Sequence, residues 1–147
     1  MSLSDRQRQF VENHNSAAML TVAADGYAKV ARIGIAIVDG NLWSSGTKDR
    51  ARTKRLRRIP RCTLFVYDTA SPQWLAIEAT VTILDGPEVP ALSLRLFRQM
   101  QGKPTGPLTW FGGVLEEDGF LQTMVDEGRL IYELTPQRVY GVYEPVA

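Results

Sequence analysis

The stretch AAMLTVAADGYAKVARIGIAIVDG, residues 17–40, contains the two signals that decide the fold. Apolar, strand-like runs end twice in an Asp-Gly pair, at Asp25-Gly26 and at Asp39-Gly40. Asp-Gly tolerates the positive φ angles of the tight turns that join neighbouring antiparallel strands. The run NLWSSG, which begins at residue 41, supplies a further strand. We therefore expect an antiparallel meander over this region.

The flanking sequence adds helices and more strands around this meander. Ser4 is a plausible N-cap for a short helix upstream, and Leu92, Leu96 and Met100 repeat at the spacing of an amphipathic helix downstream. Because closing a sheet removes vulnerable edges, we expect a small barrel or highly curved sheet, mainly β with helices (α+β), as one domain over residues 1–147. Further strands are expected at RCTLFVYD (61–68), QWLAIEATVTILDG (73–86) and RLIYELTPQRVYGVYE (129–144).

The composition excludes several classes of site. His14 and Cys62 are the only histidine and cysteine, which rules out an intramolecular disulfide, a thiolate zinc site and a multi-histidine metal site. Hydrolases with a serine or cysteine nucleophile usually need a histidine base, so that class loses support. No apolar run approaches the roughly 20 residues of a membrane span, and the N-terminus has no signal-peptide core. We expect a cytoplasmic protein without a metal.

Positive charge is concentrated in SSGTKDRARTKRLRRIP, residues 44–60. Eight basic residues and one acid lie between Lys48 and Arg61, whereas the rest of the chain is net acidic. The spacing predicts a helix that ends before Pro60 and turns Leu56, with Arg52 one turn earlier, toward the protein. A guanidinium near a helix N-terminus suits a phosphate. Hydroxyl groups that would join it there belong to Ser44, Ser45, Thr47 and Thr53.

Two other interpretations of the basic segment stay open. Its arginines could form a solvated helix face, or they could contact nucleic-acid phosphates. The acidic remainder of the chain and the absence of a helix-turn-helix or zinc-finger pattern argue against nucleic acid. We therefore expect a small-molecule ligand.

The order of these features resembles the flavin and deazaflavin split β-barrels, the pyridoxamine phosphate oxidase-like proteins. The similar segments are AAMLTVAADGYAKV, the basic segment, QWLAIEATVTIL and LTPQRVYGVY, so the resemblance spans nearly the whole chain. The spacing of Arg50 and Arg52 is most similar to the actinobacterial branch that uses coenzyme F420. Three positions depart from the family pattern: Arg52 replaces a common lysine, Ala28 a proline and Ala79 a glycine.

The resemblance implies an oxidoreductase that transfers a hydride from F420 to an oxidised, conjugated organic substrate. It implies that Arg50 and Arg52 hold the cofactor phosphate, that the ring lies along Ser44–Thr47, and that a homodimer places two cofactor sites at its interface. Arg32 is a candidate donor to the ligand, and Trp74 a candidate wall of the site. No side chain of this chain is assigned a catalytic role, because the chemistry belongs to the cofactor.

Alternatives to this function remain at the sequence level. An FMN-dependent oxidase or reductase would use the same phosphate pocket, and a noncatalytic flavin- or deazaflavin-binding protein would have the site without turnover. The surplus of basic residues at 54–58 suits the longer, oligoglutamate-bearing tail of F420. For Arg32 the alternative is a surface or dimer ion pair, and for Trp74 a place in the core. Trp110 and Phe111 are expected to form either a lid over the substrate or a buried anchor.

Overall fold

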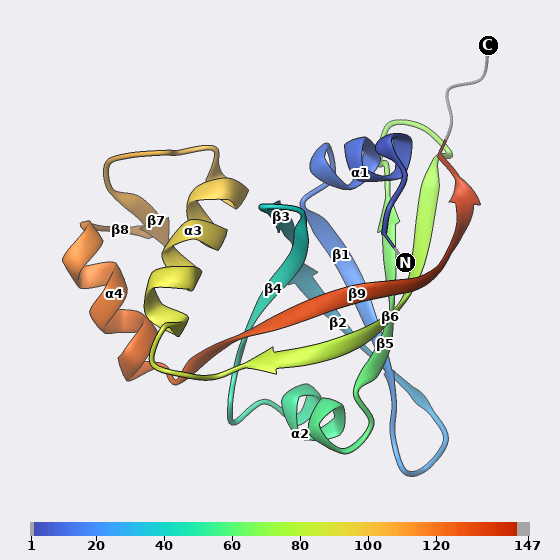
Figure 1. The fold of residues 1–147 in the computed structure, drawn as a ribbon, viewed down its shortest axis with the longest axis horizontal. Helices are drawn as coiled ribbons and strands as arrows, with labels where there is room; N and C mark the ends of the chain where they lie inside the picture. The colour runs from blue at the N-terminus through green and yellow to red at the C-terminus, as the bar shows by residue number, and fades with distance from the viewer. Residues whose placement is uncertain (1, 144–147) are drawn as a thin grey trace.

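A seven-stranded antiparallel sheet curls into a half-closed barrel, with a group of helices beside it (Figure 1). The computed structural model describes residues 2–143. Helices α1 to α4 span Asp5–Glu12, Ala51–Arg58, Val89–Gln101 and Glu117–Asp126. Strands β1 to β9 span Ser16–Val22, Ala28–Gly34, Ala36–Val38, Asn41–Thr47, Arg61–Tyr67, Trp74–Leu84, Leu108–Trp110, Gly113–Leu115 and Arg129–Val142.

The Asp-Gly pairs form hairpin turns as the sequence predicts. Asp25-Gly26 joins β1 to β2, and Asp39-Gly40 joins β3 to β4. Asp39 and Gly40 both have positive φ angles, 50° and 81°, which is the backbone geometry of a type I′ turn. Each turn therefore fixes the register of its own pair of strands.

The sheet order corrects the expected meander. The strands lie in the order β2-β1-β5-β6-β9-β4-β3, so β4 pairs with β9 and not with β2. The chain passes from one end of this order to the other across the fully buried Ile35. The Ser44 hydroxyl donates to the Gly34 carbonyl at 2.7 Å and links the two ends. Only Ile35 separates β2 from β3, which is too short a connection for a hairpin turn, so these consecutive strands do not pair and instead form the two edges of the curled sheet.

Apolar side chains fill the barrel interior. Alternate residues of β1, β5 and β6 point inward, as Met19, Leu64 and Ile77 do, and all three are buried. A separate apolar cluster lies between α3, α4 and the β7–β8 ribbon, where Phe120 is fully buried. The barrel and this helical group are therefore two packed units, and a site can form where they meet.

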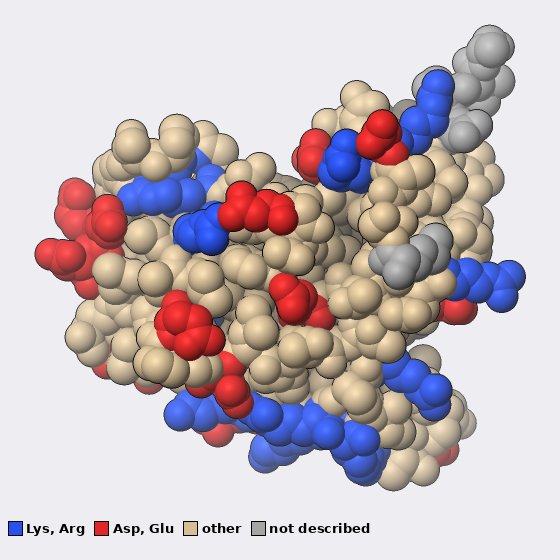
Figure 2. Space-filling model, viewed as in Figure 1, with Lys and Arg blue, Asp and Glu red and all other residues tan. Residues whose placement is uncertain are grey.

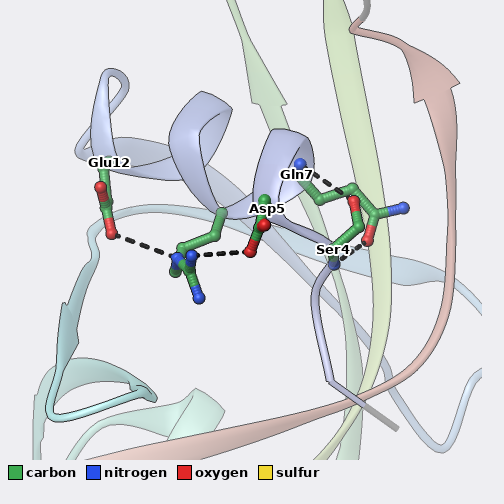
Figure 3. A network of polar contacts seen from close by, with 5 residues as sticks. Ser4, Asp5, Gln7 and Glu12 are labelled. Carbon is green, nitrogen blue, oxygen red and sulfur yellow. Dashed lines mark hydrogen bonds and ion pairs between the residues drawn. The ribbon is translucent and has the colours of Figure 1, made fainter.

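Helix α1 packs on the barrel and begins as predicted at Ser4 (Figure 3). The Gln7 backbone N–H donates to the Ser4 hydroxyl, and the Ser4 backbone N–H donates to the Gln7 side chain at 2.8 Å. This reciprocal capping satisfies two helix-end donors. Arg8 forms ion pairs with Asp5 at 2.8 Å and with Glu12 at 3.8 Å, and such exposed pairs contribute little stability.

Candidate functional site

Helix α2 carries the basic segment and is fixed against β4. Its own residues Thr53 and Leu56 are buried, and the Thr53 hydroxyl donates to the carbonyl of Thr47, at the end of β4, at 2.7 Å. The helix ends before Pro60, as predicted, because proline disfavours helical backbone in the preceding residue. Figure 2 shows Lys and Arg gathered over α2 along the lower edge of the molecule. The helix thus presents most of its positive charge outward, while Arg52 and Arg55 are each partly buried, on different sides of the helix.

A cavity of about 380 Å³ opens where the barrel meets the helical group. One side of it is polar and cationic, and the other side is apolar and aromatic. The polar side is lined by Arg32, Ser45, Arg52 and Arg129. The apolar side is lined by Ile33, Phe97, Met100, Trp110 and Phe111. Such a cavity fits a ligand that has an anionic group at one end and a flat, conjugated ring at the other.

Two buried polar atoms in this cavity have no partner among the described residues. They are Ser45 Oγ and Arg52 Nε. A buried donor or acceptor without a partner is costly, and native proteins rarely keep one without a reason. Burial lowers the pKa of the Arg52 guanidinium, and the nearby positive charges of Arg50 and Arg129 also lower it, while Tyr132 opposes them. An anion in this cavity would offset the repulsion between the positive charges, and its oxygens are candidate partners for these two atoms.

Arg129 is a third cation of the cavity, and Glu127 fixes its guanidinium group. Its Nε and one terminal nitrogen donate to Glu127 Oε1 at 2.9 and 2.7 Å, and its side chain is only 10% exposed. Trp110 Nε1 donates to Glu127 Oε2 at 3.1 Å, and the Arg129 guanidinium lies 5.0 Å from the Trp110 ring centre. Glu127 therefore ties the cationic side of the cavity to the aromatic side.

The aromatic side is built on the β7–β8 ribbon. Trp110 packs edge-to-face against Phe97 and Phe111, with ring centres 4.9 and 5.2 Å apart. The Gln101 side chain bonds both backbone groups of Thr109 at 3.0 Å, which fixes β7 to α3. Phe111 is 83% exposed and has a φ of 47°, unusual for a residue other than glycine. Of the two predicted roles, Trp110 takes the anchored one, while Phe111 stands at the cavity mouth.

The structure brings three of the eight predicted cofactor-binding residues into this cavity: Arg32, Ser45 and Arg52. Ser44 and Thr53 use their hydroxyls inside the protein, on Gly34 and Thr47. Their cofactor roles, like those of the other predicted residues, stay predictions.

The remaining predicted residues lie elsewhere. Arg50 is exposed at the N-cap of α2, and Thr47 is half-buried at the end of β4. Trp74 lies beside Phe65 and Tyr140, with ring centres 5.8 and 6.1 Å away, and it does not line the cavity. Sequence reasoning missed Arg129, Met100 and Gln101 as lining residues, because each comes from an element distant along the chain from the basic segment.

A larger cavity, of about 510 Å³, opens on the other side of α2. Arg55 lines it, but the Arg55 Nε donates to Thr21 Oγ1 at 2.9 Å, so this buried pair is satisfied. Cys62 also lines it, and burial raises the pKa of its thiol to about 12. Ser45 and Arg52, which carry the two polar atoms without a partner, do not line this larger cavity. Size alone therefore does not identify the candidate site.

Comparisons with known proteins agree with this architecture. Among residues 2–143, none of the helices α1 to α4 could span a bilayer. A search of curated proteins gave no significant match. Solved structures match over nearly the whole chain, at identities that support the fold alone.

Three of these structures illustrate the range of the fold. The conserved hypothetical protein Rv2991 from Mycobacterium tuberculosis is 18% identical, with a TM-score of 0.74 over 100% of this chain and 92% of that one. An F420 reductase is 18% identical, with a TM-score of 0.70 over 94% and 98%. HutZ, a heme storage protein from Vibrio cholerae, is 16% identical, with a TM-score of 0.64 over 95% and 94%. One fold thus carries different functions.

The sequence comparison is more specific than these structural likenesses. The family model for pyridoxamine 5'-phosphate oxidase matches residues 3–143, almost the full chain. The curled sheet with α2 against β4 agrees with the split barrel that the resemblance implies. This chain therefore belongs to the pyridoxamine 5'-phosphate oxidase family.

Proposed function

We propose that this chain is an F420-dependent oxidoreductase that transfers a hydride to an oxidised, conjugated organic substrate. The observation that carries the proposal is the two-sided cavity with its orphaned Ser45 Oγ and Arg52 Nε. These atoms suit a phosphate, and the aromatic side suits the ring of a flavin or deazaflavin. One solved structure with this fold is described as an F420 reductase.

The chain's own residues would bind and orient the cofactor. Arg52, Arg129 and Ser45 would hold its phosphate, and Arg32 would contribute from β2. Trp110 and Phe97 would pack against the ring and exclude water from one of its faces. When bound, F420 or FMN supplies the hydride chemistry, and the protein supplies position and electrostatics.

A neighbouring cavity favours F420 over FMN. This cavity, of about 480 Å³, shares Arg129 with the first and is also lined by Lys48 and Arg57. Positive charge therefore continues outward from the phosphate site, where the longer anionic tail of F420 would extend. Asp85 also lines this cavity and pairs with Arg57 at 3.0 Å, so the tail would compete with an exposed ion pair.

The sheet also offers a face for a second copy of the chain. Residues directly opposite one another in register share a face of the sheet, and an outward-facing set on β1, β2, β5, β6 and β9 is apolar and partly exposed. This set includes Val22, Val30, Tyr67, Trp74, Tyr140 and Val142. The same register also places Arg32, Glu78 and Arg138 on this face, so it combines exposed apolar and charged residues, as protein interfaces do. A homodimer through this face would cover Trp74.

Parallel titrations of the purified protein with F420 and FMN test the proposal. We expect both to bind and F420 to bind more tightly. A clear preference for FMN would support the FMN-dependent alternative, and failure of both to bind would contradict the site.

Hydride transfer from reduced F420 to a panel of quinones, enones and nitroaromatics separates an enzyme from a noncatalytic binder. Light scattering at micromolar concentration tests the dimer, and a monomer would remove the shared site.

A further inference from the structure

A chain of buried hydroxyl groups runs beneath the cationic side of the cavity. Tyr132, on β9, is fully buried, and its hydroxyl is hydrogen-bonded to Thr53 Oγ1. Thr53 is also fully buried, and its single hydroxyl hydrogen is donated to the Thr47 carbonyl at 2.7 Å. Because a threonine hydroxyl has one hydrogen, Tyr132 must be the donor to Thr53. The order is therefore Tyr132 to Thr53 to Thr47.

This hydroxyl chain holds the part of α2 that aims Arg52. Thr53 follows Arg52 directly in the first turn of the helix, and Thr47 is the last residue of β4. Tyr132 also contacts Arg52 itself, since the guanidinium carbon lies 5.9 Å from the centre of the phenol ring. An aromatic face attracts a cation at such a distance. Tyr132 thus meets Arg52 through its ring and the residue after Arg52 through its hydroxyl.

Gly46 makes room for this arrangement. A Cβ atom built on Gly46 would overlap the Tyr132 hydroxyl and the ring carbon that bears it. The φ angle of Gly46 is not positive, so the requirement is for space and not for backbone conformation. Phenylalanine at position 132 would fill almost the same core volume without a buried hydroxyl to satisfy. The hydroxyl therefore has a use other than packing.

We infer that Tyr132 is a positioning residue of the anion site: through Thr53 and the face of its ring, it holds Arg52 toward the cavity. This inference rests on the proposed function only in assuming that an anion binds at Arg52. It predicts that Tyr132 affects ligand affinity while making no contact with the ligand. Neither the sequence pattern nor the basic segment pointed to this residue.

Hydrogen exchange in the ligand-free protein tests the structural half of the inference. Tyr132→Phe and Thr53→Val both break the hydroxyl chain, so the backbone amides of Thr53 and Lys54 should exchange about tenfold faster. Thr53→Ser keeps a hydroxyl and should exchange as the wild type does. Thr21→Val is the matched control, because it removes a buried hydroxyl from the opposite side of α2. Unchanged exchange in both Tyr132→Phe and Thr53→Val would overturn the inference.

Anion binding tests the functional half, with inorganic pyrophosphate, FMN and F420 as the probes. Tyr132→Phe and Thr53→Val should each weaken binding by about five- to tenfold, and Thr53→Ser should restore it. In an Arg52→Met background, Tyr132→Phe should have no further effect, because its route to the ligand is gone. Wild-type affinity in Tyr132→Phe, or an equal loss in Thr21→Val, would contradict positioning.

The inference and the proposed function can fail separately. If wild-type protein binds pyrophosphate but neither FMN nor F420, the proposed function fails and the Tyr132 variants still decide the inference. If FMN or F420 binds and the variants bind it equally well, the inference fails and the function stands. Gly46→Ala gives a second route, because the added methyl displaces the Tyr132 hydroxyl and should reproduce the Tyr132→Phe phenotype.

Discussion

Two arginines on α2, three positions apart, have opposite surroundings. Arg55 has its Nε bonded to Thr21 Oγ1 at 2.9 Å beside the cavity of about 510 Å³. Arg52 has its Nε buried beside the cavity of about 380 Å³, with no hydrogen-bond partner within residues 2–143. The Arg55 Nε is therefore already used within the fold, whereas the Arg52 Nε would gain a partner from the anion that we propose binds there. The smaller cavity is the better candidate site because its polar groups are unsatisfied.

Replacing each of these two arginines with methionine should produce the largest effect and tests the comparison directly. Arg52→Met should weaken binding of F420, or of FMN, on the order of 100-fold, because charge-assisted hydrogen bonds to a phosphate are lost. Arg55→Met should change the affinity by less than about twofold, since its Nε is already used inside the protein. Isothermal titration of both variants measures the difference. Equal losses in both would mean that the basic segment acts only through its net charge.

The two variants should rank in the opposite order when the free energy of unfolding, and not the ligand affinity, is measured. Arg55→Met removes a satisfied bond to the buried Thr21 and should lower the free energy of unfolding by about 1 kcal/mol. Arg52→Met removes a partly buried cation that Tyr132 contacts but no carboxylate pairs with among the described residues, and it should leave that free energy unchanged or raise it by up to about 1 kcal/mol. Urea unfolding of the ligand-free proteins checks the sign. A large destabilisation by Arg52→Met would mean that Arg52 supports the fold.

The adjacent residues Ser44 and Ser45 repeat the comparison on β4. Ser44 Oγ donates to the Gly34 carbonyl, whereas Ser45 Oγ is buried and has no partner in the part of the chain that the structure describes. Ser44→Ala should lower the free energy of unfolding by about 1 kcal/mol with little change in affinity. Ser45→Ala should keep the stability and weaken ligand binding by about fivefold. Thermal unfolding measures the stability of both variants, and titration measures their ligand affinity. A loss of affinity in Ser44→Ala but not in Ser45→Ala would place the ligand on the other face of the strand.

The smallest expected effect concerns Phe111 at the cavity mouth. The positive φ of Phe111 is an unfavourable backbone conformation, and its ring, which is largely exposed, contributes little packing energy in compensation. Phe111→Gly should therefore raise the free energy of unfolding by about 0.5 kcal/mol while it weakens binding of the cofactor ring. Val114→Gly, on the same ribbon but without a positive φ, should lower the free energy of unfolding by about 0.5–1 kcal/mol. Urea unfolding compares the two, and destabilisation by Phe111→Gly would show that its ring packs firmly.

Local signals in the sequence predicted the local structure well. The Asp-Gly turns, the Ser4 cap and the end of α2 before Pro60 each depend on a few neighbouring residues. Arg52 was placed toward the protein from helical spacing alone. The exchange of β2 and β3 to opposite ends of the sheet depends on closure of the whole sheet, which no short stretch encodes.

The candidate site could be predicted only on its α2 and β4 side. Ser45 and Arg52 lie close together in sequence, whereas Arg129, Trp110 and Met100 join them only through tertiary packing. Side-chain hydroxyls also do not reveal their partners in the sequence. Ser44 and Ser45 look alike there, and only the fold shows that one of them is already used.

A crystal structure with F420 or FMN bound tests the central claim most directly. The account predicts a phosphate within hydrogen-bond distance of Arg52 Nε and Ser45 Oγ, with the ring against Trp110. A cofactor bound with its phosphate in the larger cavity beside Arg55, and Arg52 Nε left unpaired, would contradict it.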